Sequence, residues 1–98
     1  MPAVPYSYTT TLTSPCLITD TIVQVASSQG IFNPGSVSAY NQTPTYLYID
    51  TEWMQVDVLY SAESLTVPVI RGTDGSSVEA HALGASVTVT NVTPYSNP

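Results

Sequence analysis

The stretch from residue 67 to residue 90 constrains the fold of this 98-residue chain more than any other part of the sequence. It begins and ends with alternating apolar residues, the pattern of a half-buried β-strand. Between them lie a glycine-rich turn and a short segment in which Ser76 and Glu79 have the spacing of a helical capping box. Gly84 stands where a left-handed residue would end that helical turn. A crossover helix of a parallel sheet would need more residues, so the stretch predicts a capped excursion between two strands of one small β domain.

Further segments have the same alternation, and Val, Ile, Thr and Tyr dominate the apolar residues, as expected for strands. The tight Asp50-Thr51 connection predicts a hairpin between two of these segments. The sequence therefore predicts a mainly β domain, a small barrel or sandwich of about five to seven strands with one short helical turn. The predicted strands outside the opening stretch cover residues 18–25, 46–49 and 52–60.

Both ends of the chain differ from this domain in composition. Residues 1–15 and 91–98 hold five of the eight prolines and no charged side chain. Proline removes a backbone donor and favours extended geometry, so we expect an N-terminal arm over 1–17, a β domain over 18–90 and an extended tail over 91–98. Such arms would lie on neighbouring proteins. The expected anchors on a partner are Tyr6, Tyr8, Leu12 and Tyr95.

The charge balance excludes several classes of function. The chain carries one basic residue, Arg71, and seven acids, for a net charge of −6. One cation cannot neutralise several phosphates, so we expect no nucleic-acid partner and no anionic membrane surface. No apolar run is long enough to span a bilayer, and the N-terminus lacks the positive residue of a signal peptide. Cys16 is the only cysteine, so a disulfide framework is excluded and a buried apolar role is expected.

His81 is the only histidine, and together with Asp74 and Ser76 it could form a Ser-His-Asp set. A triad needs a nucleophile held apart from its base on a rigid scaffold, which one turn and a short helix do not provide. We therefore expect no enzymatic activity and a structural His81 that bonds to the backbone of its turn. Arg71 is expected to pair with Asp74 or with carbonyls of its own turn.

The acidic residues and the aromatic residues are the remaining candidates for a binding site. The spacing of the acids matches no calcium loop, so we expect neither a metal nor another cofactor. Trp53 falls on the polar face of its strand, where it either covers a second small cluster or belongs to an interface. The acids considered are Asp50, Glu52, Asp57, Asp74 and Glu79, and the candidate interface face consists of Tyr46, Tyr48 and Trp53.

One pattern in the chain resembles a known module. The segments are Arg71-Gly72-Thr73-Asp74-Gly75-Ser76 and Ala80-His81-Ala82-Leu83-Gly84, preceded by a Phe-Asn-Pro-Gly turn at 32–35 and a Glu-x-x-x-Val strand at 52–56. This combination resembles a small β module of tailed-bacteriophage virion proteins, over roughly residues 18–90. The chain departs from it at the 61–64 turn, where related sequences tend to place Gly or Asn. The residues expected to build the structural turn are Arg71, Gly72, Asp74, Gly75, Ser76, Glu79, His81 and Gly84.

The resemblance implies a virion structural protein. We expect first a capsid decoration or cement protein on the outer surface of the shell. It would be present in many copies and in contact with the major capsid protein and neighbouring copies of itself. The alternative is a tail, neck or head-fibre component that uses the module for host or carbohydrate contact. The copy number per particle separates the two.

Overall fold

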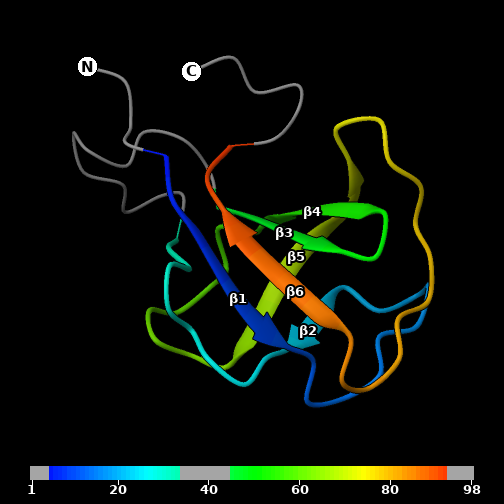
Figure 1. Ribbon diagram of the computed structural model, residues 1–98, viewed down its shortest axis with the longest axis horizontal. Helices are drawn as coiled ribbons and strands as arrows, with labels where there is room; N and C mark the ends of the chain where they lie inside the picture. The colour runs from blue at the N-terminus through cyan, green and yellow to red at the C-terminus, as the bar shows by residue number, and fades with distance from the viewer. Residues whose placement is uncertain (1–4, 34–44, 93–98) are drawn as a thin grey trace.

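The computed structural model describes residues 5–33 and 45–92, and the structural statements that follow concern these residues. They form a single antiparallel sheet with the strand order β1-β6-β3-β4-β5-β2 (Figure 1). The predicted mainly β fold is confirmed, and the strand number falls in the predicted range. The strands are β1 (Ser7–Thr11), β2 (Ile22–Gln24), β3 (Tyr46–Ile49), β4 (Glu52–Val56), β5 (Thr66–Thr73) and β6 (Ser86–Thr90).

The two ends of the sheet approach each other without closing it into a barrel. An isolated bridge joins Leu12, just after β1, to Val25, just after β2. Two backbone hydrogen bonds flank this bridge, from Thr13 N–H to Gln24 C=O (2.9 Å) and from Ala26 N–H to Thr11 C=O (3.0 Å). The curled sheet therefore has a core face on its inside and an outer face.

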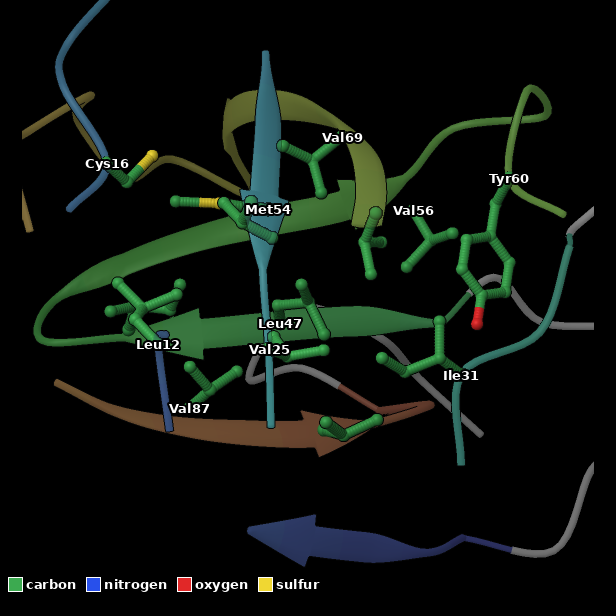
Figure 2. Close-up of a cluster of buried hydrophobic side chains, with 14 residues drawn as sticks. Leu12, Cys16, Val25, Ile31, Leu47, Met54, Val56, Tyr60, Val69 and Val87 are labelled. Carbon is green, nitrogen blue, oxygen red and sulfur yellow. The ribbon is translucent and has the colours of Figure 1, made fainter. Parts of the chain in front are cut away.

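The core follows from the alternation of side chains along the strands. Leu47 and Ile49 on β3 are fully buried, as are Met54 and Val56 on β4. Figure 2 shows that side chains from the strands and from the segments around them point into one cluster. Fully burying one such side chain contributes roughly 1.5–3 kcal/mol, so this cluster stabilises the sheet.

The N-terminal segment is part of the sheet, which corrects the expected arm over 1–17. β1 pairs with β6 over its whole length, with Ser7 opposite Thr90 and Thr11 opposite Ser86. Leu12 is 2% exposed and belongs to the core. Alternation over 6–12 places every second side chain on the core face, and this pattern outweighs the nearby prolines. Residues 1–4 and 93–98, including Tyr95, lie outside the described residues, so the tail expected over 91–98 is described only at its first two positions.

The predicted helical turn is absent, because its two capping residues bond elsewhere. No helix occurs among residues 5–33 and 45–92. The Ser76 hydroxyl donates to Thr73 C=O (2.7 Å) and accepts from Trp53 N–H (2.9 Å). The Glu79 carboxylate accepts from the Thr51 amide (3.0 Å) and hydroxyl (2.7 Å). Both side chains therefore hold an irregular loop against the β3–β4 hairpin.

Three glycines between residues 72 and 84 have a left-handed backbone, which the sequence predicts for Gly84. Gly72, Gly75 and Gly84 have φ angles of 61°, 81° and 87°. At Gly72 an added Cβ would also lie 3.0 Å from Val78 Cγ2, so a side chain there meets both strain and a close neighbour. The turn at 61–64 also needs a residue with a left-handed backbone, since Glu63 has a φ of 66°. That position would suit the Gly or Asn found in the related pattern.

β4 is shorter than the strand expected over 52–60. It ends at Val56, and the Asp57 side chain then accepts from Leu59 N–H (3.1 Å), as turn-forming aspartates do. Val58 is consequently 63% exposed instead of continuing the apolar face. No helix in the described part of the chain is long and apolar enough to cross a membrane.

Candidate functional site

A buried carboxylate, that of Glu52, is the centre of the polar contacts in this protein. Glu52 is the first residue of β4 and lies directly after the two-residue Asp50-Thr51 turn. Strand alternation places it on the same face as Met54 and Val56, and it is 0% exposed. A buried charge is strongly unfavourable unless it is paired and hydrogen-bonded, so the surrounding donors must offset the cost of burying it.

Five donors surround the Glu52 carboxylate. The Arg71 guanidinium donates from Nε to Oε2 (2.8 Å) and from Nη2 to Oε1 (3.0 Å). This is the bidentate geometry of a strong arginine–carboxylate pair. The backbone amides of Gly72 (3.0 Å) and Glu79 (3.1 Å) add two more, and His81 Nε2 lies 2.8 Å from Oε1. Arg71 and Gly72 lie in the last part of β5, and Glu79 and His81 lie in the segment between β5 and β6. Glu52 thus holds the glycine-rich loop to the sheet.

Arg71 extends this network to the chain before β2. Its Nη1 donates to the carbonyls of Leu17 and Asp20, and its Nη2 donates to Glu79 C=O (2.8 Å). The side chain is only 7% exposed. The expected partner, Asp74, is not in contact with it, and one Asp74 oxygen is buried without a hydrogen-bond partner. The prediction that Arg71 binds carbonyls of its own turn is correct only for Glu79, and its ionic partner is Glu52.

His81 lies between two carboxylates. Its Nδ1 is 2.7 Å from Asp50 Oδ2, and its Nε2 is 2.8 Å from Glu52 Oε1. Both ring nitrogens therefore lie within hydrogen-bond distance of a carboxylate oxygen, so the ring links the Asp50 and Glu52 side chains. The backbone of His81 pairs with Cys16 through two hydrogen bonds of 2.9 and 2.7 Å. The expected bonding to backbone therefore holds for the His81 main chain, and its ring binds side chains instead.

We refer to Asp50, Glu52, Arg71 and His81 as the Glu52 cluster. Burial by itself raises the pKa of Glu52, but the hydrogen bonds from Arg71, the Glu79 amide, His81 and the Gly72 amide outweigh it and lower the pKa to about 2. Hydrogen bonding to Glu52 raises the pKa of Arg71. Both groups therefore stay charged at neutral pH. The side chain of Asp50 is 56% exposed, so the cluster reaches solvent there.

The cluster does not have the arrangement of the triad considered from the sequence. His81 contacts Asp50 and Glu52, while the Ser76 hydroxyl bonds to the backbone of Thr73 and Trp53. Burial raises the pKa of the Cys16 thiol, which keeps it protonated and unreactive at neutral pH. In the described part of the chain, no three His, Cys, Asp or Glu side chains are placed to hold a metal ion.

The three aromatic residues proposed as an interface face do come together. Tyr48 and Trp53 are opposite each other on β3 and β4, with ring centroids 4.5 Å apart, and Tyr46 meets Trp53 edge-on at 6.4 Å. Tyr46 is 9% exposed, whereas Tyr48 and Trp53 are partly exposed. Trp53 therefore does cover a second small cluster, on the outer face of the sheet.

The expected anchors near the N-terminus serve the domain itself. The Tyr6 hydroxyl donates to Gly30 C=O (2.6 Å), and its ring lies 5.7 Å from that of Tyr8 and 6.2 Å from that of Phe32. Burial raises the pKa of this Tyr6 hydroxyl. Tyr8 keeps 38% of its surface exposed, and Leu12 is in the core. Of the three, Tyr8 alone is exposed enough to reach another molecule.

Sequence reasoning treated Glu52 and Asp50 as scattered acids and did not bring them together with Arg71 and His81. The signal was present for Glu52, because alternation from Met54 and Val56 places it on the buried face.

A scan against protein-family models and searches of curated proteins and of solved structures found no match to this chain.

Proposed function

We propose that this chain is a bacteriophage virion structural protein, a decoration or cement protein that binds the outer surface of the capsid in many copies. One observation carries the proposal. The motif residues on which the phage resemblance rests are far apart in the sequence, yet they meet in the Glu52 cluster. Glu52 opens the Glu-x-x-x-Val strand, Arg71 and Gly72 open the Arg-Gly turn, and His81 lies in the Ala-His-Ala segment. The pattern therefore corresponds to one physical unit.

The use of charge in the cluster supports a structural role. Arg71 is the only Lys or Arg of the chain, and its guanidinium donates hydrogen bonds to Glu52 and to backbone carbonyls. With this cation internal, no Lys or Arg side chain is left to bind phosphates. The hydrogen bonds of Glu52 and His81 are likewise made within the protein, which favours a rigid scaffold over a reacting site.

Exposed apolar side chains support a protein that is covered in an assembly. Two adjacent pairs are notable: Leu59 is 77% and Val58 is 63% exposed, and Ile18 is 62% and Leu17 is 57% exposed. Single exposed apolar residues are ordinary, whereas large contiguous apolar patches mark contact sites, and these pairs are where such a patch could form. Only 8% of the residues are charged, so few charges surround these pairs.

A second candidate function rests on the outer aromatic pair. Tyr48 and Trp53 are partly exposed with their rings 4.5 Å apart. Aromatic rings of this kind serve sugar contacts as well as protein contacts. This pair favours the alternative function, that of a tail, neck or head-fibre component that contacts the host or its carbohydrates.

The number of copies per particle tests the proposal. Virions of the phage that encodes this chain would be purified, and the chain would be quantified against the major capsid protein by mass spectrometry with labelled peptide standards. A copy number comparable with that of the capsid protein is expected. A handful of copies would favour the tail or fibre alternative, and absence from purified virions would overturn both.

A further inference from the structure

β5 ends in a tight turn whose two central residues are Asp74 and Gly75 (Figure 1). Both residues have a left-handed backbone, with φ angles of 54° and 81°, and Ser76 N–H closes the turn on Thr73 C=O (3.0 Å). An Asp-Gly pair favours this backbone in a two-residue turn. Gly75 is exposed, so its backbone is open to solvent.

An aspartate that precedes glycine can rearrange without an enzyme. The backbone nitrogen of the glycine attacks Cγ of the aspartate and closes a five-membered succinimide ring. One carboxylate oxygen leaves as water, with the amide proton and one proton from solvent. A second water then opens the ring, and where it breaks the bond between the main-chain carbonyl carbon and the nitrogen, the chain continues through Cγ as isoaspartate. A side chain on the attacking residue hinders the attack, most of all when it is branched at Cβ, and glycine has no side chain.

Two features distinguish Asp74 from the three other aspartates of the chain. The first is the residue that follows, which is glycine for Asp74 and a residue branched at Cβ for the others. The other pairs are Asp20-Thr21, Asp50-Thr51 and Asp57-Val58. The second is hydrogen bonding, because each of those three side chains binds a nitrogen of Leu17, His81 or Leu59. Asp74 Oδ2 has no partner within the described residues, so no hydrogen bond at this oxygen has to break before Cγ reaches the Gly75 nitrogen.

We propose that Asp74 is a site of spontaneous isomerisation to isoaspartate, and that this modification loosens the glycine-rich loop from the β3–β4 hairpin. Isoaspartate adds one carbon atom to the main chain between Thr73 and Ser76. The Ser76 hydroxyl bonds to both Thr73 C=O (2.7 Å) and Trp53 N–H (2.9 Å), and these two contacts depend on the shape of the turn. A longer main chain in the turn cannot keep both.

The inference concerns the folded chain in solution and does not depend on the proposed virion role. The purified protein would be kept at physiological temperature and neutral pH in water enriched in heavy oxygen, because each opening of the ring takes one oxygen from the solvent. Cleavage after glutamate in ordinary water then separates the peptides 1–52, 53–63 and 64–79, and only the last contains Asp74. Mass spectrometry should show uptake in 64–79 at least about tenfold faster than in the other two, a difference of about 1.4 kcal/mol in activation free energy.

Asp74→Glu is the matched control, because it keeps the charge but would require a six-membered ring, which closes more slowly. It should remove the uptake from this segment. Far-UV circular dichroism would check that the variant is folded, and the comparison among the wild-type peptides decides the question without it. Equal uptake in the three peptides, or none in 64–79, overturns the modification site.

The effect on the loop needs a second measurement. The isoaspartyl form would be isolated from aged protein by ion-exchange chromatography, and its melting temperature would be followed by Trp53 fluorescence. It should melt below the unmodified fraction of the same sample, since the Ser76 contacts are lost. An unchanged melting temperature of the isolated isoaspartyl form overturns the proposed loosening of the loop.

Discussion

Replacing Glu52 with glutamine tests the central claim about this fold, that one buried carboxylate holds the glycine-rich loop to the sheet. Glutamine has nearly the same shape as glutamate, so the change leaves no cavity. It removes the charge opposite Arg71, whose side chain is 7% exposed. It also turns one acceptor oxygen into an NH₂ group that faces donors, such as Arg71 Nε and the Gly72 amide on one side.

The expected loss is large for a domain of this size. Each pKa unit corresponds to about 1.4 kcal/mol, so the fall of the Glu52 pKa from 4.5 to about 2 amounts to roughly 3 kcal/mol. Removing one partner of a buried ion pair typically costs about 3–5 kcal/mol, which agrees. Small domains have a total free energy of unfolding of roughly 5–15 kcal/mol. A loss of 3 kcal/mol would lower the melting temperature by roughly 12–24 °C in a chain of this length.

Urea unfolding at pH 7, followed by Trp53 fluorescence and by circular dichroism, would measure this difference. Glu63→Gln is the matched control, because it makes the same charge change at an exposed turn position and should alter the free energy of unfolding by less than about 0.5 kcal/mol. A loss below about 1 kcal/mol for Glu52→Gln would refute the reasoning, since that is the value of an exposed ion pair.

Three further predictions concern pH, the loop and the surface. Because the folded pKa of Glu52 is depressed, its stabilisation is fully present above about pH 4.5 and is lost as the pH falls toward 2. Wild type should therefore lose more stability over this interval than Glu52→Gln, and equal losses in urea titrations would contradict it. Gly72→Ala should lower the free energy of unfolding by about 1 kcal/mol or more in thermal melts, owing to its φ of 61° and the neighbouring Val78. The double change Val58→Asn and Leu59→Asn should reduce attachment to capsids that lack the native protein, measured by co-sedimentation, without lowering the melting temperature.

The sequence was informative wherever neighbouring residues decide the structure. The β3–β4 hairpin follows from alternation on both sides of the Asp50-Thr51 turn, and the same alternation is consistent with the buried positions of Leu47 and Met54. The left-handed glycines followed from turn chemistry alone. In each case the physical cause acts within a few residues, so a local pattern contains it.

The predictions were wrong where residues far apart in the sequence determine the local structure. Ser76 and Glu79 have the spacing of a capping box, but their side chains bind Trp53 and Thr51, which are 23 and 28 positions away. Those bonds take the place of the cap bonds that a helical turn would need. β1 was predicted to be part of an arm because prolines flank it, and its partner, β6, lies at the other end of the chain, where no local pattern points to the pairing. For the Glu52 cluster, alternation could place Glu52 inside, but no spacing rule pairs it with Arg71.

The neighbouring positions of β1 and β6 have a mechanical consequence. These first and last strands run antiparallel, and Ser7 is opposite Thr90, so the chain enters and leaves the sheet at the same end. A force pulling the two termini apart would act across the strands, along the interstrand hydrogen bonds. The pairs would then open one after another from Ser7–Thr90, as in a zipper, instead of resisting together in shear. A load applied through both termini would therefore detach β1 at low force, while a load carried by the folded face would leave the sheet intact.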